Sequence, residues 1–566
     1  MKDNLVSPKA SGWLLLILII TYIVFIPSLY NSFTTWDDPD LLTQNPLVQS
    51  VSWQNIKKIF TTSIEGRYYP LTILSFAIEF KLWGLNPYFY HLTNLILHLI
   101  NIILVFWVLQ YLKLNLRVCL FATLLFGLHP LQVESMAWVS SRKDVLFAGF
   151  LLLAILNYIK AKTYLDQSKK YSLLALLCFV VSLFAKPMGV SLPFVLLLID
   201  FYFTDKINRK DVLNKLPYLA LAVLVCFIHW WAFDAAYAFP ANRIYSFIDR
   251  FWFSCLATLF YISQIIFPTI LSCFYPLPKT INGHYSFIVY AAPLIVFGLI
   301  YLILRNKYLG KARVAFLFFL VMMFPVLHFI KINDSLIYER FVYIPSLGIF
   351  ILLAVIIDWL LKKDSKKPGL ALLIKWIFIL YIIYLASLSF VRTQIWKNDE
   401  KLWSDNIKTF PSNPVAYNNR GSYFWQKGHM RLAFNDFNKA ILLEPNYGLA
   451  YFNRGNIYAA YNLYDQAIKD YSNAVKVNPR EILAFNNRGN MYAVLGRPDL
   501  AIKDYSEALK INPQHMPALL NRAGVYYGEN QWQEARKDYK RALTIDPQND
   551  IARKMIIILD KKDNDN

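Results

Sequence analysis

The 566-residue sequence has little charge, little glycine and few cysteines. Charged residues make up 17% of it and hydrophobic residues 57%, a balance too apolar for a soluble protein of this length. Its five cysteines lie in or beside apolar runs, and residues 401–566 contain none. We therefore predict neither a disulfide framework nor a thiolate metal site.

Long apolar runs are abundant between residues 11 and 391 and disappear from about residue 399 onward. Each run is long enough to cross the ~30 Å hydrocarbon layer as a helix. The first run ends without a small-residue cleavage pattern, so we expect an uncleaved span rather than a signal peptide. We predict eleven spans, near residues 11–30, 89–111, 116–131, 144–160, 171–186, 188–203, 216–234, 285–304, 313–330, 342–361 and 370–391.

Three further apolar segments are not expected to cross the membrane. The stretch 251–267 would reverse the orientation of everything after it, so we interpret it as re-entrant or interfacial. The long loop 31–88 contains VSWQNIKKIF and LTILSFAIEFKLWG, which are too short or too polar to span. We expect both to form amphipathic helices at the membrane surface.

The net charge of +21 comes mostly from the predicted membrane part. Residues 401–566 carry a net charge of +6, which leaves +15 in the first 400 residues. There the cations gather in four short loops between spans, which is the positive-inside pattern rather than a nucleic-acid-binding surface. We expect an integral protein of the inner or plasma membrane with a cytoplasmic N-terminus, and with loop 31–88 and everything after residue 391 outside the cytoplasm. The loop cations are Lys160, Lys162, Lys169, Lys170, Lys206, Arg209, Lys210, Lys215, Arg305, Lys307, Lys311, Arg313, Lys362, Lys363, Lys366 and Lys367.

Residues 396–566 are predicted to form a domain of tetratricopeptide repeats that follows a membrane domain over residues 1–395. Segments beginning AYNNRG, AYFNRG, AFNNRG and ALLNRA recur every 34 residues, and a proline closes each unit. Small residues that let paired helices approach, with aromatic residues that fill the gaps, are typical of this repeat. We place repeat starts near residues 414, 448, 482 and 516 and a capping helix at 550–562. Arginine stands where the repeat usually has leucine, at Arg420, Arg454, Arg488 and Arg522.

Each repeat also carries an asparagine at the same helical position. An amide offers a donor and an acceptor together, which suits gripping an extended peptide backbone without reading its side chains. The pattern resembles the asparagine ladder inside the repeat superhelix of O-GlcNAc transferase. The alternative is that these side chains only bind neighbouring helices. The predicted acceptor-binding ladder is Asn419, Asn453, Asn487 and Asn521.

The predicted membrane part contains no GxGxxG, Walker lysine loop, GxSxG or HExxH motif, but polar residues gather at the predicted outer ends of its spans. Ionisable groups at membrane depth are expensive and usually functional. Guanidinium and ammonium groups at this level are suitable partners for a lipid-linked phosphate, although each alone also fits an interfacial anchor. The candidate phosphate-binding cations are Arg67, Arg142, Lys143, Lys186 and Arg340.

The aspartates of WDDPD, residues 36–40, directly follow the first span. A carboxylate beside a cationic phosphate site is placed to accept the proton of a hydroxyl that attacks a sugar carbon. The same residues also fit a solvated helix cap. We predict Asp37 or Asp38 as the catalytic base and Asp40 as a cap.

Other polar residues are weaker candidates. His91, Asn94 and His98 share one helix face, a stripe that favours interhelical hydrogen bonding over metal ligation. Second-tier site candidates are Tyr68, His129, Glu134 and Glu339.

Several long blocks resemble one known family. FTTWDDPDLLTQNPLV, HPLQVESMAWVSSRKDVLF, KPMGVSLPFVLLLIDFY, ERFVYIPSLGIF and RTQIWKNDEKLWSD, followed by the repeats, are similar to the transmembrane-and-TPR (TMTC) family and its bacterial relatives. The resemblance covers nearly the whole chain and is weakest over residues 205–310. It implies a GT-C glycosyltransferase fold similar to the protein O-mannosyltransferases, which use polyprenyl-phosphate sugar donors and an acidic pair in the first outer loop. Carried over to this sequence, that pair falls on Asp37 and Asp38.

The resemblance fixes no cofactor. Some GT-C enzymes hold a divalent metal at the acidic cluster and others do not, so a metal at Asp37 and Asp38 stays open. We expect an all-α protein in which a GT-C-like polytopic membrane domain precedes an α-solenoid of repeats.

We expect this protein to transfer a sugar from a polyprenyl-phosphate donor to an extracytoplasmic acceptor, foremost a protein that the repeats recruit. Its predicted partners are that donor, a protein or peptide acceptor and membrane lipid, without nucleic acid. The alternative is a non-catalytic, membrane-anchored repeat scaffold for envelope protein assembly. A flippase or channel is disfavoured because no span carries a series of charges.

Overall fold

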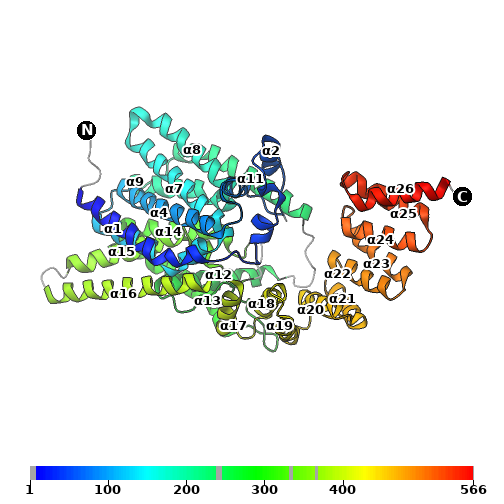
Figure 1. Cartoon of the computed structure of the whole chain (residues 1–566). Coiled ribbons are helices and arrows are strands. Elements are labelled where there is room, and N and C mark those ends of the chain that lie inside the picture. The colour runs from blue at the N-terminus through cyan, green and yellow to red at the C-terminus, as the bar shows by residue number, and fades with distance from the viewer. Residues whose placement is uncertain (1–7, 65, 237–244, 330–334, 364–367, 565–566) are drawn as a thin grey trace. The chain divides into compact units, whose positions relative to one another are not determined.

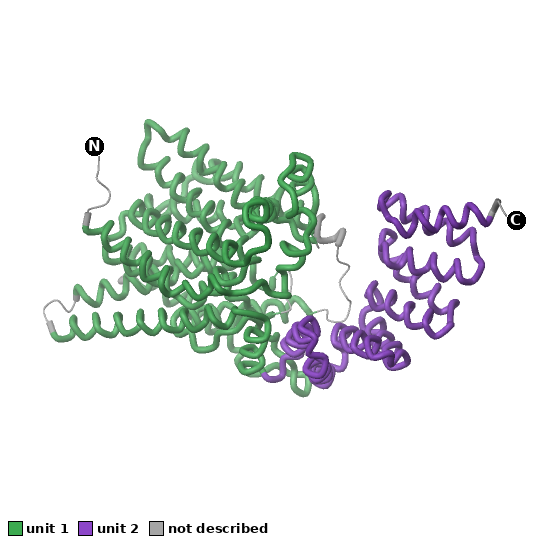
Figure 2. The backbone as a smooth tube through the Cα atoms, in the orientation of Figure 1, with its two compact units in different colours: residues 1–239, 243–410 green, residues 240–242, 411–566 purple. Residues whose placement is uncertain are grey.

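All secondary structure in the described part of the chain is helical, and no β-strand occurs there. A computed structural model describes residues 8–64, 66–236, 245–329, 335–363 and 368–564. The chain divides into two compact units, which Figure 2 draws in green and purple, with the boundary between Phe410 and Pro411. The all-α fold class predicted from the sequence is confirmed.

The first unit contains the helices that are long and apolar enough to cross a membrane. Nine described helices meet this test of length and composition, and they mark the chain as a membrane protein. They are built on α1 (Pro8–Phe25), α4 (Pro87–Tyr111), α7 (Arg142–Thr163), α8 (Ser168–Ala185), α9 (Leu192–Thr204), α11 (Leu216–Ala236), α13 (Phe287–Arg305), α14 (Arg313–Met323) and α16 (Pro368–Ile395).

Two of the eleven predicted spans differ from simple spans for identifiable reasons. The span predicted at 116–131 is a pair, α5 (Leu116–Leu128) and a helix that begins at Pro130, bent by 53°. The proline cannot continue the hydrogen-bond ladder of the preceding helix, which explains the break. The span predicted at 342–361 forms α15 (Ser346–Lys363), whose last turns carry Asp358, Lys362 and Lys363 and lower its apolar character.

The remaining helices of the first unit are shorter or more polar. The stretch predicted as re-entrant or interfacial forms α12 (Phe247–Ile266), which is not among the nine candidates. The others are α2 (Trp53–Thr61), α3 (Pro70–Trp83), α6 (Val133–Ala137), α10 (Arg209–Leu213) and α17 (Asp399–Thr409).

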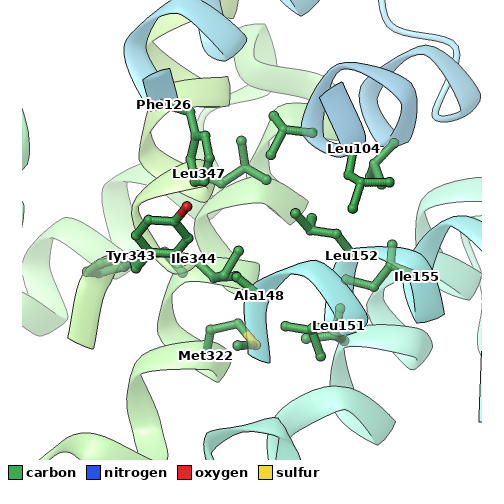
Figure 3. Close-up of a cluster of buried hydrophobic side chains, with 14 of the residues drawn as sticks. Leu104, Phe126, Ala148, Leu151, Leu152, Ile155, Met322, Tyr343, Ile344 and Leu347 are labelled. Carbon is green, nitrogen blue, oxygen red and sulfur yellow. The ribbon is translucent and has the colours of Figure 1, made fainter. Parts of the chain in front are cut away.

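The centre of the first unit is a packed apolar core. Leu104 of α4, Phe126 of α5 and Leu152 of α7 meet Met322 of α14 and Leu347 of α15 (Figure 3). All five belong to one continuous cluster of buried residues. Such packing fixes the helices relative to one another, and several of the polar residues discussed below lie at their ends or in the adjoining loops.

The loop after α1 folds as a small layer of its own. Both predicted segments form helices, α2 (Figure 1) and α3, but only α2 is amphipathic. The prediction is wrong for α3, because it exposes apolar Ile78 and Leu82 and buries Glu79. Ser52 begins α2 by accepting the Asn55 N–H at 3.2 Å, and the Trp53 side chain beside it is 79% exposed. On the other side, Ile59 of α2 and Phe76 of α3 lie in a common buried cluster. The loop is therefore a folded platform rather than a flexible linker.

The second unit is a stack of helix pairs, as the repeat pattern predicts. The first helices of the pairs begin at the four predicted starts, and α26 (Asp550–Asn564) closes the series (Figure 1). At Gly455 a Cβ would lie 2.8 Å from the ring of Tyr471, so the glycine permits this close approach. The pairs are α18 (Pro414–Gln426) with α19 (Met430–Leu443), α20 (Gly448–Ala460) with α21 (Tyr464–Val477), α22 (Ile482–Val494) with α23 (Pro498–Ile511), and α24 (Met516–Gly528) with α25 (Trp532–Ile545).

The arginines that replace leucine have a structural role in the repeats. Arg488 binds both carboxylate oxygens of Asp504, sixteen residues later, at 2.7 and 2.8 Å. It also donates to the Ser472 hydroxyl of the preceding repeat at 3.0 Å. Equivalent bidentate pairs form in all four repeats, joining Arg420 to Asp436, Arg454 to Asp470, Arg488 to Asp504 and Arg522 to Asp538.

Breaking one of these pairs is expected to destabilise the repeats. Asp504→Ala leaves the largely buried Arg488 without its bidentate partner, and we expect a loss of about 2–3 kcal/mol. Thermal unfolding of the full-length protein measures it. Glu507→Ala on the same helix removes only an exposed pair with Lys510 and should cost under about 0.5 kcal/mol. Equal losses in both variants would contradict a structural role for the Arg–Asp pair.

Candidate functional site

The two neighbouring aspartates after α1 have different surroundings. Asp38 is 1% exposed, and both of its oxygens already accept hydrogen bonds. One oxygen accepts the N–H and the hydroxyl of Thr34 at 2.7 and 3.0 Å. The other accepts the N–H of Ser140 at 3.0 Å and the Ser140 hydroxyl. Burial raises the pKa of Asp38, although these hydrogen bonds oppose the increase. Asp38 thus joins its own loop to the segment before α7.

Asp37 faces cations instead. One carboxylate oxygen lies 3.0 Å from a guanidinium nitrogen of Arg67, and the other lies 3.4 Å from the Lys143 ammonium. Burial alone would raise the pKa of Asp37, but Lys143, Arg67 and Arg340 together lower it to about 2. The carboxylate is therefore fully ionised at neutral pH. It is the member of the pair whose oxygens point at charged partners.

Two further ion pairs lie near Asp37 in the same unit. Arg340 pairs with Glu134 and lies close enough to lower the pKa of Asp37. Lys186 pairs with Asp144, which follows Lys143 in sequence. Arg67, Lys143, Lys186 and Arg340 thus belong to three neighbouring ion-pair groups, which together form the charged network around Asp37.

Arg142 has separate partners. Its guanidinium lies 3.1 Å from Glu79 of α3, donates to the Tyr90 carbonyl at 2.8 Å and also donates to the Asn94 side chain. The side chain is only 1% exposed. These contacts join α3, α4 and α7, so Arg142 is engaged in holding helices together.

Aromatic rings surround the cations beside Asp37. The Lys143 ammonium lies 5.4 Å from the Tyr69 ring centre and 5.3 Å from that of Trp138, which are cation–π distances. Trp36, the residue before Asp37, stacks on Trp138 at 5.1 Å. Arg340 lies 5.1 Å from Trp138. Apolar faces that screen water strengthen the electrostatic interactions of the cations and the carboxylate.

The second-tier candidates differ in role. Glu134 belongs to the network through Arg340. Glu339 pairs with Arg392 at 3.3 Å and accepts the Tyr275 hydroxyl at 2.8 Å. His129 accepts the Leu131 N–H at 3.2 Å, an ordinary helix-capping contact.

Tyr68 is half-buried and donates to the Phe60 carbonyl at 2.9 Å. Two members of the predicted stripe hydrogen-bond to neighbouring segments. His98 lies 2.6 Å from the Tyr343 hydroxyl and 3.3 Å from the Gly127 carbonyl of α5, and Asn94 donates to the Trp138 carbonyl at 3.1 Å. The ring nitrogens of His91 are buried without such a partner.

The donor set around the aspartates does not fit a divalent metal. Such ions need several free oxygen ligands. Asp37 is committed to two cations, and Asp38 is saturated by hydroxyl and amide donors. Within the described ranges no group of three or more His, Cys, Asp or Glu side chains is arranged to hold a metal. We derive no step that passes through one.

The open side of the site is toward Arg67. This side chain is 37% exposed, whereas those of Asp37 and Lys143 are 11% and 5% exposed. A cavity of about 330 Å³ in the first unit lies elsewhere, beside Arg392 and Asp405, and none of the predicted site residues lines it.

In the repeats, several side chains of the asparagine ladder already donate hydrogen bonds to other asparagines. Asn453 donates to the Asn418 side chain at 2.9 Å, and Asn487 donates to Asn456 at 3.1 Å. Asn521 donates to Asn486 and Asn490. The ladder asparagines therefore hydrogen-bond to asparagines of the preceding repeat. The four ladder residues are half-buried.

Several residues of the site were missed from the sequence. Thr34 and Ser140 hold Asp38, Asp144 pairs with Lys186, and Trp36 and Trp138 stack over the cations. Serine and threonine are too common to signal such a role. Asp144 directly follows Arg142 and Lys143, and only this position beside two candidate cations could have indicated its role.

Comparison with known proteins agrees with the pattern of the sequence. Residues 414–447, 448–481, 482–515 and 517–549 match the tetratricopeptide repeat family. A protein O-mannosyl-transferase of Caenorhabditis elegans, F38B6.6, is 23% identical over 473 residues, covering 78% of this chain and 65% of the relative. Human protein O-mannosyl-transferase TMTC4 is 25% identical over 487 residues, covering 74% of this chain and 65% of the relative.

Human protein O-mannosyl-transferase TMTC1 is 23% identical over 432 residues, covering 67% of this chain and 48% of the relative. The resemblance to the TMTC family is thereby confirmed. The matched part of this chain spans less than two thirds of the length of the worm protein and of human TMTC4, 65% in each case.

Solved structures resemble part of this chain. YrrB, described as a TPR protein with an unusual peptide-binding site, is 18% identical and covers 29% of this chain and 85% of its own, with a TM-score of 0.28. PilF of Pseudomonas aeruginosa is 20% identical and covers 33% of this chain and 82% of its own, with a TM-score of 0.28.

Proposed function

We propose that this chain is a membrane glycosyltransferase of the GT-C type that transfers a sugar from a polyprenyl-phosphate donor to a protein acceptor. The observation that carries the proposal is the position of Asp37 between Arg67 and Lys143, with Arg340 close by. A base and a phosphate-binding group are thus adjacent in one site. The names of the relatives support mannose as the sugar and protein as the acceptor.

Asp37 is the proposed general base. An acceptor hydroxyl attacks the anomeric carbon of the sugar, the bond from that carbon to the phosphate oxygen breaks, and polyprenyl phosphate leaves with the electron pair. Asp37 takes the hydroxyl proton. Asp38 is unsuited to this role because its oxygens already accept four hydrogen bonds. Asp38 instead sets the position of Asp37.

Donor binding would adjust the basicity of Asp37. With cations alone beside it, the pKa of Asp37 is about 2, too low for an efficient base at neutral pH. A donor phosphate that shares Arg67 and Lys143 places negative charge against them. Their effect on the carboxylate then weakens, so the pKa of Asp37 rises when the donor is present. The base becomes effective only in the loaded site.

The cations are proposed to hold the donor phosphate and stabilise the leaving group. Arg67 is the most exposed and would meet the phosphate first, and Lys143 and Arg340 lie deeper. Lys186 is paired with Asp144, so this pair adds no net positive charge and Lys186 has at most a secondary part in holding the phosphate. Arg142 is excluded from this set because Glu79 and Asn94 occupy it.

The positive-inside charge pattern supports the proposed orientation. The N-terminus would be cytoplasmic, and the Asp37 site and the repeats would lie on the opposite side. The repeats would hold the acceptor while the membrane domain performs the transfer. The alternative is the non-catalytic scaffold, which shares the repeats but needs no transfer.

Direct transfer tests the proposal. Purified protein in nanodiscs is mixed with a polyprenyl-phosphate mannose and a serine- and threonine-containing acceptor peptide, and the product is measured by mass spectrometry. The glycoproteins of the native envelope are compared with and without the protein. Transfer in the wild type supports the enzyme. Unchanged glycoproteins and no product, with intact peptide binding, would favour the scaffold.

The asparagine ladder should affect acceptor affinity rather than chemistry. In Asn453→Ala/Asn487→Ala, two rungs lose their amides, and we expect KM for a long peptide acceptor to rise about 10- to 100-fold with kcat nearly unchanged. Steady-state kinetics with a long and a short acceptor measure this. Asn473→Ala, on the second helix of its repeat, is the matched control. An equal effect of the control would point to general disruption of the repeats.

A further inference from the structure

The segment that connects the last membrane helix to α17 lies against the loop that carries Asp37. Ser32 donates its N–H and its hydroxyl to the Lys397 carbonyl at 3.0 and 2.8 Å. Asn31 donates its side chain to the Thr393 carbonyl at 3.2 Å. These partners are more than 360 residues apart in sequence. The first and last parts of the first unit therefore meet at this point.

Asp399 accepts the hydrogen bond from this loop that is nearest in sequence to the proposed base. It is 1% exposed, and its carboxylate accepts the N–H of Thr35 at 2.8 Å. Thr35 precedes Trp36 and Asp37 directly. Trp36 in turn packs against Trp403 of α17 at 5.2 Å. One turn of α17 thus touches the two residues that lead into Asp37.

Helix capping does not account for Asp399. The first turn of α17 is capped by Asn398, whose side chain accepts the Lys401 N–H at 3.0 Å. Asp399 turns away from the helix toward Thr35, and burial raises its pKa to about 6. A buried carboxylate is costly unless it is hydrogen-bonded, and the N–H of Thr35 outside α17 supplies a hydrogen bond to Asp399.

We propose that Asp399 is a positioning residue, which with the 393–403 segment fixes the backbone of residues 31–36 and thereby aims Asp37 at its substrate. The inference rests on the proposed function for its catalytic consequence, but the fixation itself is independent of it. It also implies that a working membrane domain extends through Phe410, because cutting at residue 395 would remove Asp399 and Trp403.

Hydrogen exchange and transfer rate together test the inference. In Asp399→Ala the Thr35 N–H loses its acceptor, and we expect its exchange in the full-length protein to speed up about tenfold or more, with kcat falling similarly and the KM for donor little changed. Asp399→Asn keeps an acceptor oxygen and should restore both properties. Glu400→Ala, which removes an exposed charge from the same turn, should change neither.

A second variant covers the case in which Asp399→Ala does not fold. In Ser32→Ala the hydroxyl that donates to the Lys397 carbonyl is removed, so we expect backbone hydrogen exchange in residues 31–36 to speed up, with a smaller fall in kcat than in Asp399→Ala. Unchanged exchange in every variant that folds overturns the fixation. Faster exchange with unchanged kcat overturns the positioning role. If wild-type protein transfers no sugar, the proposed function fails, while hydrogen exchange still decides whether the 393–403 segment fixes the loop.

Discussion

Asp37→Asn is expected to lower the rate of sugar transfer by about 100- to 10,000-fold, the range that a positioned general base contributes. The amide keeps the size of the side chain but accepts no proton. Product formation from a polyprenyl-phosphate sugar, followed in nanodiscs under single-turnover conditions, measures the effect on the chemical step. Donor binding should survive, because Arg67, Lys143 and Arg340 remain in place.

The control for Asp37→Asn is Asp40→Asn. Asp40→Asn changes an acidic residue of the same loop in the first turn that follows Pro39, and its rate should stay within about twofold of wild type. Asp37→Asn leaves Lys143 with one partner fewer, so both variants are assayed below their unfolding temperatures. A transfer rate near wild type in Asp37→Asn would remove Asp37 from the mechanism.

Glu79→Gln is expected to destabilise the membrane unit by about 3–5 kcal/mol. Glu79 is the charged partner of Arg142, and both side chains are almost completely buried. The substitution removes the negative charge and leaves the buried guanidinium with neutral acceptors, the new side-chain amide, the Asn94 amide and the Tyr90 carbonyl. Thermal or denaturant unfolding of the full-length protein in detergent measures the loss.

Lys81→Gln is the matched control for Glu79→Gln. It lies two residues further along α3, is exposed, and should change stability by less than about 0.5 kcal/mol. If instead Glu79→Gln is as stable as the control but loses donor binding, Arg142 would return to the set of phosphate-binding cations. The two measurements therefore separate a structural arginine from a ligand-binding one.

Much of the fold was predictable from periodicity. Repeats of 34 residues gave the helix starts of the second unit, and apolar length gave the candidate spans. The two exceptions arise from local chemistry that a run of apolar letters does not show. Pro130 breaks one predicted span, and the charges near the end of α15 weaken another.

The sequence predicts which residues form the candidate site, but not which of them pair with one another. The sequence indicated Asp37, Arg67 and Lys143, and the structure brings them together. It could not separate Asp37 from Asp38, because neighbouring side chains take different directions and one is saturated by Thr34 and Ser140. Likewise Arg142 and Lys143 are adjacent on α7, yet successive helical positions lie about 100° apart and so meet different partners.

The Arg–Asp pairs of the second unit bear on how the array is able to change in length. Arg454, Arg488 and Arg522 each bind a carboxylate within their own repeat and a polar side chain of the preceding one. The first three 34-residue repeats carry an acceptor for the arginine of the next repeat, at Asn438, Ser472 and Ser506, whereas the fourth has Lys540 at that position. Duplicating or deleting the second or third repeat therefore leaves an equivalent contact at the new junction, so the array is able to change in length by whole internal repeats.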